Sequence, residues 1–164
     1  MTQQRCWTSW TGRKAGRTAY RILMILTDVN VLLYAFRPQA PDHQLFRSWL
    51  DGVINGSEAY GYADAVLSSF LRIATNPVMM TQADVFEDAL AFTQVFRGQP
   101  HAVRIAPGER HWAMFVELCR ASGAKGNLIP DAYLAALAIE SGSEWVTTDG
   151  DFARFPGLRW RRPF

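Results

Sequence analysis

Cysteine is scarce in this sequence, and the two that occur are far apart. Cys6 and Cys119 form no closely spaced pair, which argues against both a disulfide framework and a cysteine-ligated zinc site. Long apolar runs are also missing, since no stretch approaches the roughly 20 residues that a membrane-spanning helix requires. We therefore expect a protein of the reducing cytoplasm that does not enter a membrane.

Several patterns of catalysis and nucleotide binding are missing as well. The three histidines have no mutual spacing and no neighbouring serine or cysteine nucleophile, so a hydrolase triad is not indicated. No glycine-rich phosphate-binding loop occurs, and the acids do not follow the spacing of a calcium-binding loop. Any catalysis must therefore rest on other residues.

The composition is that of one globular domain with an unusual N-terminal segment. The 164 residues, 49% of them hydrophobic and 20% charged, are enough for a single full core. Residues 1–23 carry five basic residues and no acid, whereas residues 24–164 carry 12 basic and 15 acidic residues. The basic segment is either a nucleic-acid-binding arm or an extension that is disordered or not native. We favour the second interpretation because Met24 directly opens the first apolar run.

From residue 24 onward, short apolar runs alternate with longer segments of helical periodicity. The apolar runs predict strands at 25–27, 58–62, 144–148 and 158–161. Apolar spacings of three and four predict helices at 31–36, 42–55, 63–74, 82–96, 107–122 and 131–141. This alternation indicates an α/β domain with a mainly parallel central sheet that is covered on both faces.

Three carboxylates are expected at one edge of this sheet. Asp28 follows the first strand, Asp149 follows the strand at 144–148, and Asp131 opens a helix. In an α/β fold the strands end and the helices begin at the same edge, where ligands gather. Asp151 lies two positions beyond Asp149. Acids that are distant in the sequence are therefore expected to converge in space.

Each of these acids also has an ordinary structural explanation. Asp131 could serve only to stabilise the N-terminus of its helix, and "TTDGDF" (147–152) could be only a turn. Three or four acids at one edge would repel one another unless a cation neutralised them or some were protonated. We favour the cation. Oxygen ligands without histidine or cysteine suit Mg²⁺ or Mn²⁺, and such ions support phosphodiester hydrolysis.

Four segments of the sequence resemble one known family. They are "TDVNVLLYAF", "FLRIATNP", "IPDAYLAALAIESG" and "WVTTDGDFARFPGLRW", and they occur in the order typical of the PIN-domain ribonucleases, specifically toxins of the VapC type. The resemblance covers residues 24–164. It implies a three-layer α/β/α domain and a Mg²⁺- or Mn²⁺-dependent endoribonuclease that cleaves structured RNA such as tRNA or rRNA and inhibits translation. It also implies a VapB-type antitoxin as partner, and homodimers are usual in the family.

The resemblance assigns roles to individual residues. Asp28, Asp131 and Asp149 match the metal-binding acids of the family's catalytic site. Asp151 matches a further acid that often supports this site, and Asn30 would orient Asp28 or hold the local turn.

Other positions of the motifs are less direct matches. Thr147 and Thr148 match the stretch just before Asp149 in which the family has hydroxyl side chains. Of the two, the resemblance assigns a supporting role at the site to Thr148. Where the family commonly has a glutamate in the second motif, this sequence has Ser69. Either the site has fewer acids and binds metal more weakly, or Asp64 compensates. A helix cap is the commoner role for an aspartate at the position of Asp64.

Arginine and aromatic residues near the motifs have two interpretations each. Arg72 could contact an RNA phosphate or pair with a carboxylate. Arg159, Arg161 and Arg162 could assist RNA binding or form only a solvated face. Aromatic residues at helical spacings, Trp112 among them, are expected in the core, although some could form a surface that binds the antitoxin.

Two other functions stay open at this stage. The serine at position 69 motivates a catalytically impaired PIN fold that serves as a binding module. A phosphoacceptor receiver domain also has acids at a sheet edge, but it normally needs a lysine there. The chain has only Lys14 and Lys125, and Lys125 lies in "GAKG", away from any predicted strand end.

Overall fold

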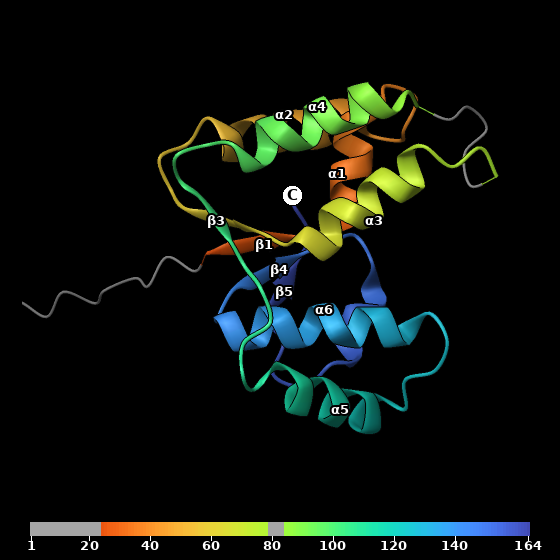
Figure 1. Ribbon diagram of the computed structural model, residues 1–164, viewed down its shortest axis with the longest axis vertical. Coiled ribbons are helices and arrows are strands. Elements are labelled where there is room, and N and C mark those ends of the chain that lie inside the picture. The colour runs from red at the N-terminus through yellow and green to blue at the C-terminus, as the bar shows by residue number, and fades with distance from the viewer. Residues whose placement is uncertain (1–23, 79–83) are drawn as a thin grey trace, which may run out of the picture.

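A sheet of five parallel strands forms the centre of the protein. In the computed structural model, which describes residues 24–78 and 84–164, the strands lie in the order β3-β2-β1-β4-β5 (Figure 1). Their bounds are β1 Ile25–Thr27, β2 Tyr60–Tyr62, β3 Ala102–Arg104, β4 Glu144–Val146 and β5 Trp160–Arg161. Every neighbouring pair is parallel, so all the strands end at one edge. The basic segment 1–23 lies outside the described residues, and both interpretations of it stay predictions.

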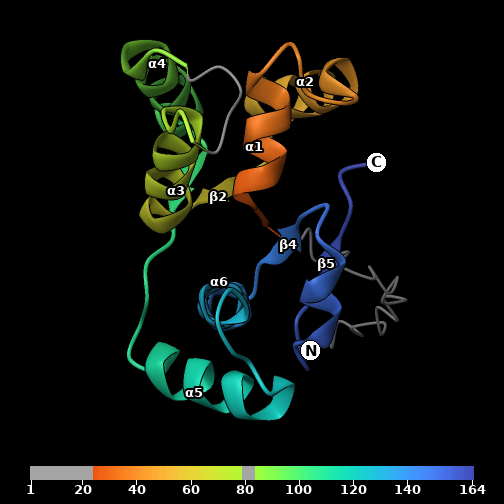
Figure 2. The same cartoon turned by 90° about the vertical axis from the view of Figure 1, so that its right-hand side faces the viewer.

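Helices cover both faces of this sheet, as Figures 1 and 2 show. One face carries α1 (Val29–Phe36), α2 (His43–Ile54), α3 (Asp64–Ala74) and α4 (Phe86–Arg97). The other face is covered by α6 (Leu128–Ser141), and α5 (His111–Ser122) packs on the outside of α6. The predicted three-layer α/β/α domain with a parallel central sheet is confirmed. None of the helices in the described ranges is both long and apolar enough to cross a membrane.

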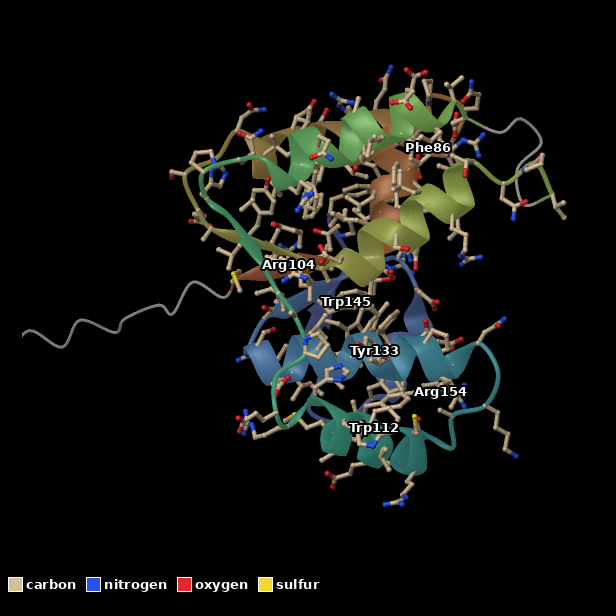
Figure 3. All side chains as sticks on the ribbon, in the orientation of Figure 1. Phe86, Arg104, Trp112, Tyr133, Trp145 and Arg154 are labelled. Carbon is tan, nitrogen blue, oxygen red and sulfur yellow. The ribbon has the colours of Figure 1, made fainter. Side chains whose placement is uncertain are left out.

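The core is built on the two central strands. Leu26 of β1 and Trp145 of β4 are neighbours in the sheet and are fully buried, and burial of such a side chain contributes about 1.5–3 kcal/mol. Figure 3 labels Trp145 between the helices of the two faces. On α6 the buried positions are mostly alanine, namely Ala132, Ala135, Ala136 and Ala138. These small side chains let α6 lie close to the sheet.

Aromatic contacts join α5 to α6. The ring of Tyr133 lies 4.3 Å from that of His111 and 5.8 Å from that of Phe115, measured between centroids. Trp112, which is labelled on α5 in Figure 3, is 68% exposed. The prediction that Trp112 belongs to the core is therefore wrong, because only the inner side of this outer helix has a packing partner.

The first residues of α1, α2 and α3 differ from the predicted starts by one or two residues, and those of α4, α5 and α6 differ by three or four. The helix predicted from residue 107 begins at His111. The residues before it form a loop, because the carboxylate of Glu140 accepts hydrogen bonds from the main-chain N–H groups of Gly108 and Arg110, at 2.8 and 3.0 Å. The helix predicted from Asp131 begins at Leu128, since a proline is tolerated in a first turn whose N–H groups have no intrahelical partner. The helix predicted from residue 82 begins at Phe86; residues 82–83 lie outside the described ranges.

Two elements were not predicted. β3 is an edge strand of three residues, and the side chains of Val103 and Arg104 are exposed, so it has no apolar run to reveal it. Residues Gly150–Arg154, for which a simple turn was one interpretation, form the 3-10 helix η1.

Candidate active site at the carboxyl ends of the central strands

Asp28 joins the end of β1 to the start of α1. Its main-chain N–H donates to the carbonyl oxygen of Val146 at 2.9 Å, which continues the pairing with β4. Its side chain caps α1, since Oδ1 accepts a hydrogen bond of 2.6 Å from the N–H of Val29. Asp28 is only 4% exposed. The fold therefore fixes this carboxylate in a buried position at the ligand-binding edge of the sheet.

The hydroxyl of Thr147 links the acids of this edge. It donates to Oδ2 of Asp28 at 2.5 Å and accepts from Nδ2 of Asn30 and from the N–H of Asp149, each at 3.0 Å. Nδ2 of Asn30 also donates to Oδ2 of Asp28 at 3.0 Å. A hydroxyl offers one donor and two acceptor positions, and here all three are used. Thr147 thereby ties two acids into one rigid network.

Asp149 caps the 3-10 helix, since its Oδ1 accepts a hydrogen bond of 2.8 Å from the N–H of Asp151. Asp151 itself is exposed, and its carboxylate lies 3.8 Å from a guanidinium nitrogen of Arg154. A surface ion pair at this distance holds the side chain only weakly. Asp151 is therefore free to move toward a ligand at the edge.

Electrostatic effects show which acids lie near one another. Burial raises the pKa of Asp28 to about 6, and the hydrogen bonds from Thr147 and Val29 oppose that shift, while the charges of Asp131 and Asp149 add to it. Burial also raises the pKa of Asp131 to about 6, with further contributions from Asp149 and Asp151. Asp131 and Asp149 thus lie close enough to Asp28, and Asp149 and Asp151 close enough to Asp131, for their charges to disfavour its ionisation.

The acidic side chains are not arranged as a complete metal-binding site. Across residues 24–78 and 84–164, no group of three or more His, Cys, Asp or Glu side chains is arranged so that it could hold a metal ion. The chemistry of the donor set nevertheless fits Mg²⁺ or Mn²⁺, which prefer carboxylate oxygens. Burial is the main cause of the raised pKa values of Asp28 and Asp131, and neighbouring acids add to it; a divalent cation would stabilise these carboxylates in their charged form.

Asp64 is not among the charges that raise the pKa of Asp28 or Asp131. It is the first residue of α3 and makes no cap hydrogen bond, since Ala63 occupies the cap position. Instead, its Oδ2 accepts from Nε and Nη2 of Arg104 on β3, at 2.9 and 2.5 Å, and the hydrogen bond from Arg104 lowers its pKa. Figure 3 labels Arg104 beside this end of α3. The expectation of a helix cap at Asp64 is wrong, because α3 begins one residue earlier than a cap at Asp64 requires and the carboxylate pairs with Arg104 instead.

The remaining predicted residues lie around the site in different ways. Ser69 is half-buried on α3, and Arg72, one turn further along, is exposed. Thr148 is connected through its backbone, since its N–H lies 3.4 Å from Oδ1 of Asn30. The hydroxyl that contacts Asp28 belongs to Thr147 instead. The strand register explains why Thr147 is the residue in contact with Asp28. Thr27 pairs with Val146, so the next residues along, Asp28 and Thr147, lie side by side.

Comparisons with known proteins agree with this fold. The PIN domain family matches residues 25–158. VapC ribonuclease Mb2897 of Mycobacterium bovis is 41% identical over 140 residues, which is 85% of this chain and 95% of that protein. Ribonuclease VapC25 of Mycobacterium tuberculosis is 40% identical, and the match covers 85% of this chain and 99% of that protein.

Solved structures show the same architecture. VapBC2 from Rickettsia felis, bound to a DNA fragment from its promoter, matches with a TM-score of 0.63 at 18% identity, over 85% of this chain and 98% of that one. VapC20 of Mycobacterium tuberculosis, described as a toxin that cleaves the sarcin-ricin loop, matches with a TM-score of 0.56 at 14% identity. The match covers 82% of this chain and 98% of that one. These two likenesses concern the fold alone. From the family match and the relatives of about 40% identity, the chain belongs to the PIN-domain family and, within it, to the VapC ribonucleases.

Proposed function

We propose that this chain is a metal-dependent endoribonuclease toxin that cleaves structured RNA, such as tRNA or rRNA, and thereby inhibits translation. Its relatives of about 40% identity are named ribonucleases, which supports the reaction class. One structural observation carries the proposal. The carboxylate of Asp28 is buried and held by three hydrogen-bond donors, yet burial and two neighbouring acids raise its pKa to about 6.

In this proposal Asp28, Asp131 and Asp149 hold Mg²⁺ or Mn²⁺. When bound, such an ion lowers the pKa of an attacking water and neutralises charge on the phosphate. The protein supplies orientation: the N–H of Val29 and the hydroxyl of Thr147 fix the two oxygens of Asp28. Fixing a ligand through its hydrogen-bond partners typically matters 10- to 100-fold for affinity or activity, an order-of-magnitude figure.

Other residues have supporting roles. Asp151 is exposed and is within electrostatic reach of Asp131, so it is placed to help as a general base. Arg72 is exposed on α3, where its guanidinium can meet an RNA phosphate. Ser69 adds no charge, which leaves a site with fewer acids than the usual family pattern. Asp64 does not compensate, since Arg104 binds its carboxylate.

The partners follow from the same assignment. We propose a VapB-type antitoxin as the neutralising partner, because the solved VapC relatives of this fold include toxin–antitoxin complexes from Rickettsia felis and Haemophilus influenzae. Homodimer formation is part of the proposal, and RNA is the substrate.

A second candidate is a PIN fold that binds without cleaving, and Ser69 is the observation that favours it. Calorimetric titration with Mn²⁺ discriminates between the two. A binding-only protein gives little heat with Mn²⁺ and no cleavage that depends on the acids.

Substitution of Asp28 tests the proposed activity. Asp28→Asn should abolish Mg²⁺-dependent cleavage of RNA, because it removes a ligand charge while the amide oxygen can still cap α1. Asp51→Asn is a matched control, since Asp51 is an exposed acid of α2 that pairs with Arg47. Circular dichroism must show both variants folded. Undiminished cleavage by Asp28→Asn would refute the proposed function.

A further inference from the structure

A pocket of about 370 Å³ lies beside the carboxylates, at the C-terminal end of the chain. Its wall includes Tyr34, Asp42, Phe46, Thr148, Arg162 and Phe164, together with two prolines. Thr148 directly precedes Asp149 and contacts Asn30 through its N–H, so the pocket continues from the candidate active site. Figure 2 shows the C-terminal end of the chain beside α1.

Aromatic rings form the apolar part of this pocket. The ring of Phe46 lies 4.9 Å from that of Tyr34 and 4.9 Å from that of Phe164, measured between centroids. Phe46 is buried, whereas Phe164 is 60% exposed. An exposed ring supported from behind offers a face on which a planar partner can stack, and nucleobases stack on such rings.

The charged residues of the pocket favour a nucleotide over a purely apolar ligand. Arg162 is exposed, and a guanidinium matches phosphate geometry. Asp42 precedes α2 but makes no cap hydrogen bond, so the helix does not use its carboxylate. Of the non-glycine residues in the described ranges, Asp42 alone has a positive φ, at 54°. Aspartate adopts this left-handed conformation more readily than most residues, and here it leaves the carboxylate in the pocket wall without a helix-cap hydrogen bond.

A carboxylate such as that of Asp42 matches one of the four bases better than the others. Guanine presents two adjacent N–H groups on its pairing edge, and these match the two oxygens of a carboxylate, which only accepts. Adenine and cytosine each present an amino group beside a lone pair, and uracil presents an N–H between two carbonyl oxygens. The unpaired bases of RNA are read on such edges while they stack on aromatic side chains.

We propose that this pocket is a subsite for one unstacked guanine base of the RNA substrate. Phe164 stacks on the base, Asp42 accepts hydrogen bonds from its pairing edge, and Arg162 lies near its phosphate. The inference rests on the proposed function, which supplies RNA as the ligand. It adds a residue-level origin for a sequence preference next to the cleavage site.

Binding of single nucleotides tests the subsite without any need for cleavage. Guanosine 5′-monophosphate is titrated into the full chain in EDTA and followed by calorimetry, beside the adenosine, cytidine and uridine monophosphates and inorganic phosphate. The guanine nucleotide should bind about tenfold more tightly than the others, and Phe164→Ala should weaken it by about tenfold. Asp42→Asn should remove the preference for guanine. Trp112→Ala is the matched control, because Trp112 is an exposed aromatic on α5, away from the C-terminal end (Figure 2).

Several results would overturn the subsite. They are equal binding of all four nucleotides, displacement of the guanine nucleotide by an equal concentration of inorganic phosphate, and unchanged binding in Phe164→Ala. A change of oligomeric state in Phe164→Ala with unchanged nucleotide binding would make the pocket a contact between copies. RNA cleavage without any base preference would remove the subsite and leave the proposed function standing. Guanine binding by a chain that cleaves no RNA would support the subsite and contradict the proposed function.

Discussion

The hydroxyl of Thr147 and the carboxylate of Asp28 are joined by a hydrogen bond of 2.5 Å across the ends of two neighbouring parallel strands. Their separation in the chain is 119 residues, yet the pairing of Thr27 with Val146 makes the contact a consequence of the sheet register. This hydrogen bond lowers the pKa of Asp28 against the larger effect of burial. The contact therefore controls how readily the carboxylate becomes a ligand.

Removal of this hydroxyl should weaken the site. Thr147→Val keeps the shape of the side chain but deprives Asp28 of a donor, and it leaves Asn30 and the N–H of Asp149 without their acceptor. We expect Mn²⁺ affinity and RNA cleavage to fall by roughly 10- to 100-fold. Calorimetry and a cleavage assay measure the two quantities. Thr147→Ser, which restores the hydroxyl, should stay close to the parent, and equal losses in both variants would contradict the role of the hydrogen bond.

Cation binding should depend strongly on pH. Asp28 and Asp131 both have a pKa of about 6 in the metal-free protein, and each must lose its proton to become a ligand. Two such groups make the apparent dissociation constant for Mn²⁺ about 100-fold weaker at pH 5 than at pH 7. Calorimetric titrations at several pH values check this dependence. An affinity that does not change between pH 5 and pH 7 would show that these two acids are not the ligands.

The stability of the metal-free protein should also depend on Asp28. Its pKa is raised from 3.8 to about 6, so the folded state binds the proton more tightly than the unfolded state. The resulting stability is fully present below pH 3.8 and is lost as the pH rises through about 6. Asp28→Asn, which carries no charge at any pH, should exceed the parent in free energy of unfolding by roughly 2–3 kcal/mol at pH 7. Near pH 4 this advantage should disappear.

Urea denaturation in EDTA at both pH values measures the difference. Asp51→Asn serves as control, because that acid is exposed and its removal leaves the site intact. A parent that is more stable than Asp28→Asn at pH 7 without metal would contradict the cost assigned to the buried charge.

The serine in the second motif gives a further test. Ser69→Glu supplies the acid that the family pattern has at this position, so we expect it to tighten Mn²⁺ binding about tenfold, as an added charged ligand does. Ser68→Glu is the matched control, since Ser68 is exposed and lies in a groove with Asp64 and residues of α4. If both variants bind Mn²⁺ equally, position 69 has no special relation to the site.

Much of the fold was predictable because apolar patterning and packing agree in this chain. Leu26 and Trp145 lie in short apolar runs, and both are buried in the central strands. Asp28 and Asp149 could be assigned to one edge because parallel strands end together. These predictions needed only the order of elements along the chain.

The remaining features depend on contacts between distant residues. The predicted first residues of α5 and α6 were wrong for two reasons. Glu140 binds the loop before α5, and Pro130 is accommodated in the first turn of α6. β3 has exposed side chains and is revealed only by its pairing with β2. The choice of Thr147 over Thr148 as the residue in contact with Asp28 required the register of β1 against β4. A pattern in one segment cannot report such contacts.

The central claim is that Asp28, Asp131 and Asp149 share one divalent cation. A crystal of the chain grown with Mn²⁺ and measured at the manganese absorption edge tests it most directly. The account predicts one or more anomalous peaks within about 2.0–2.3 Å of carboxylate oxygens of all three acids. No peak between them, or acids that remain too far apart to reach one ion, would contradict it.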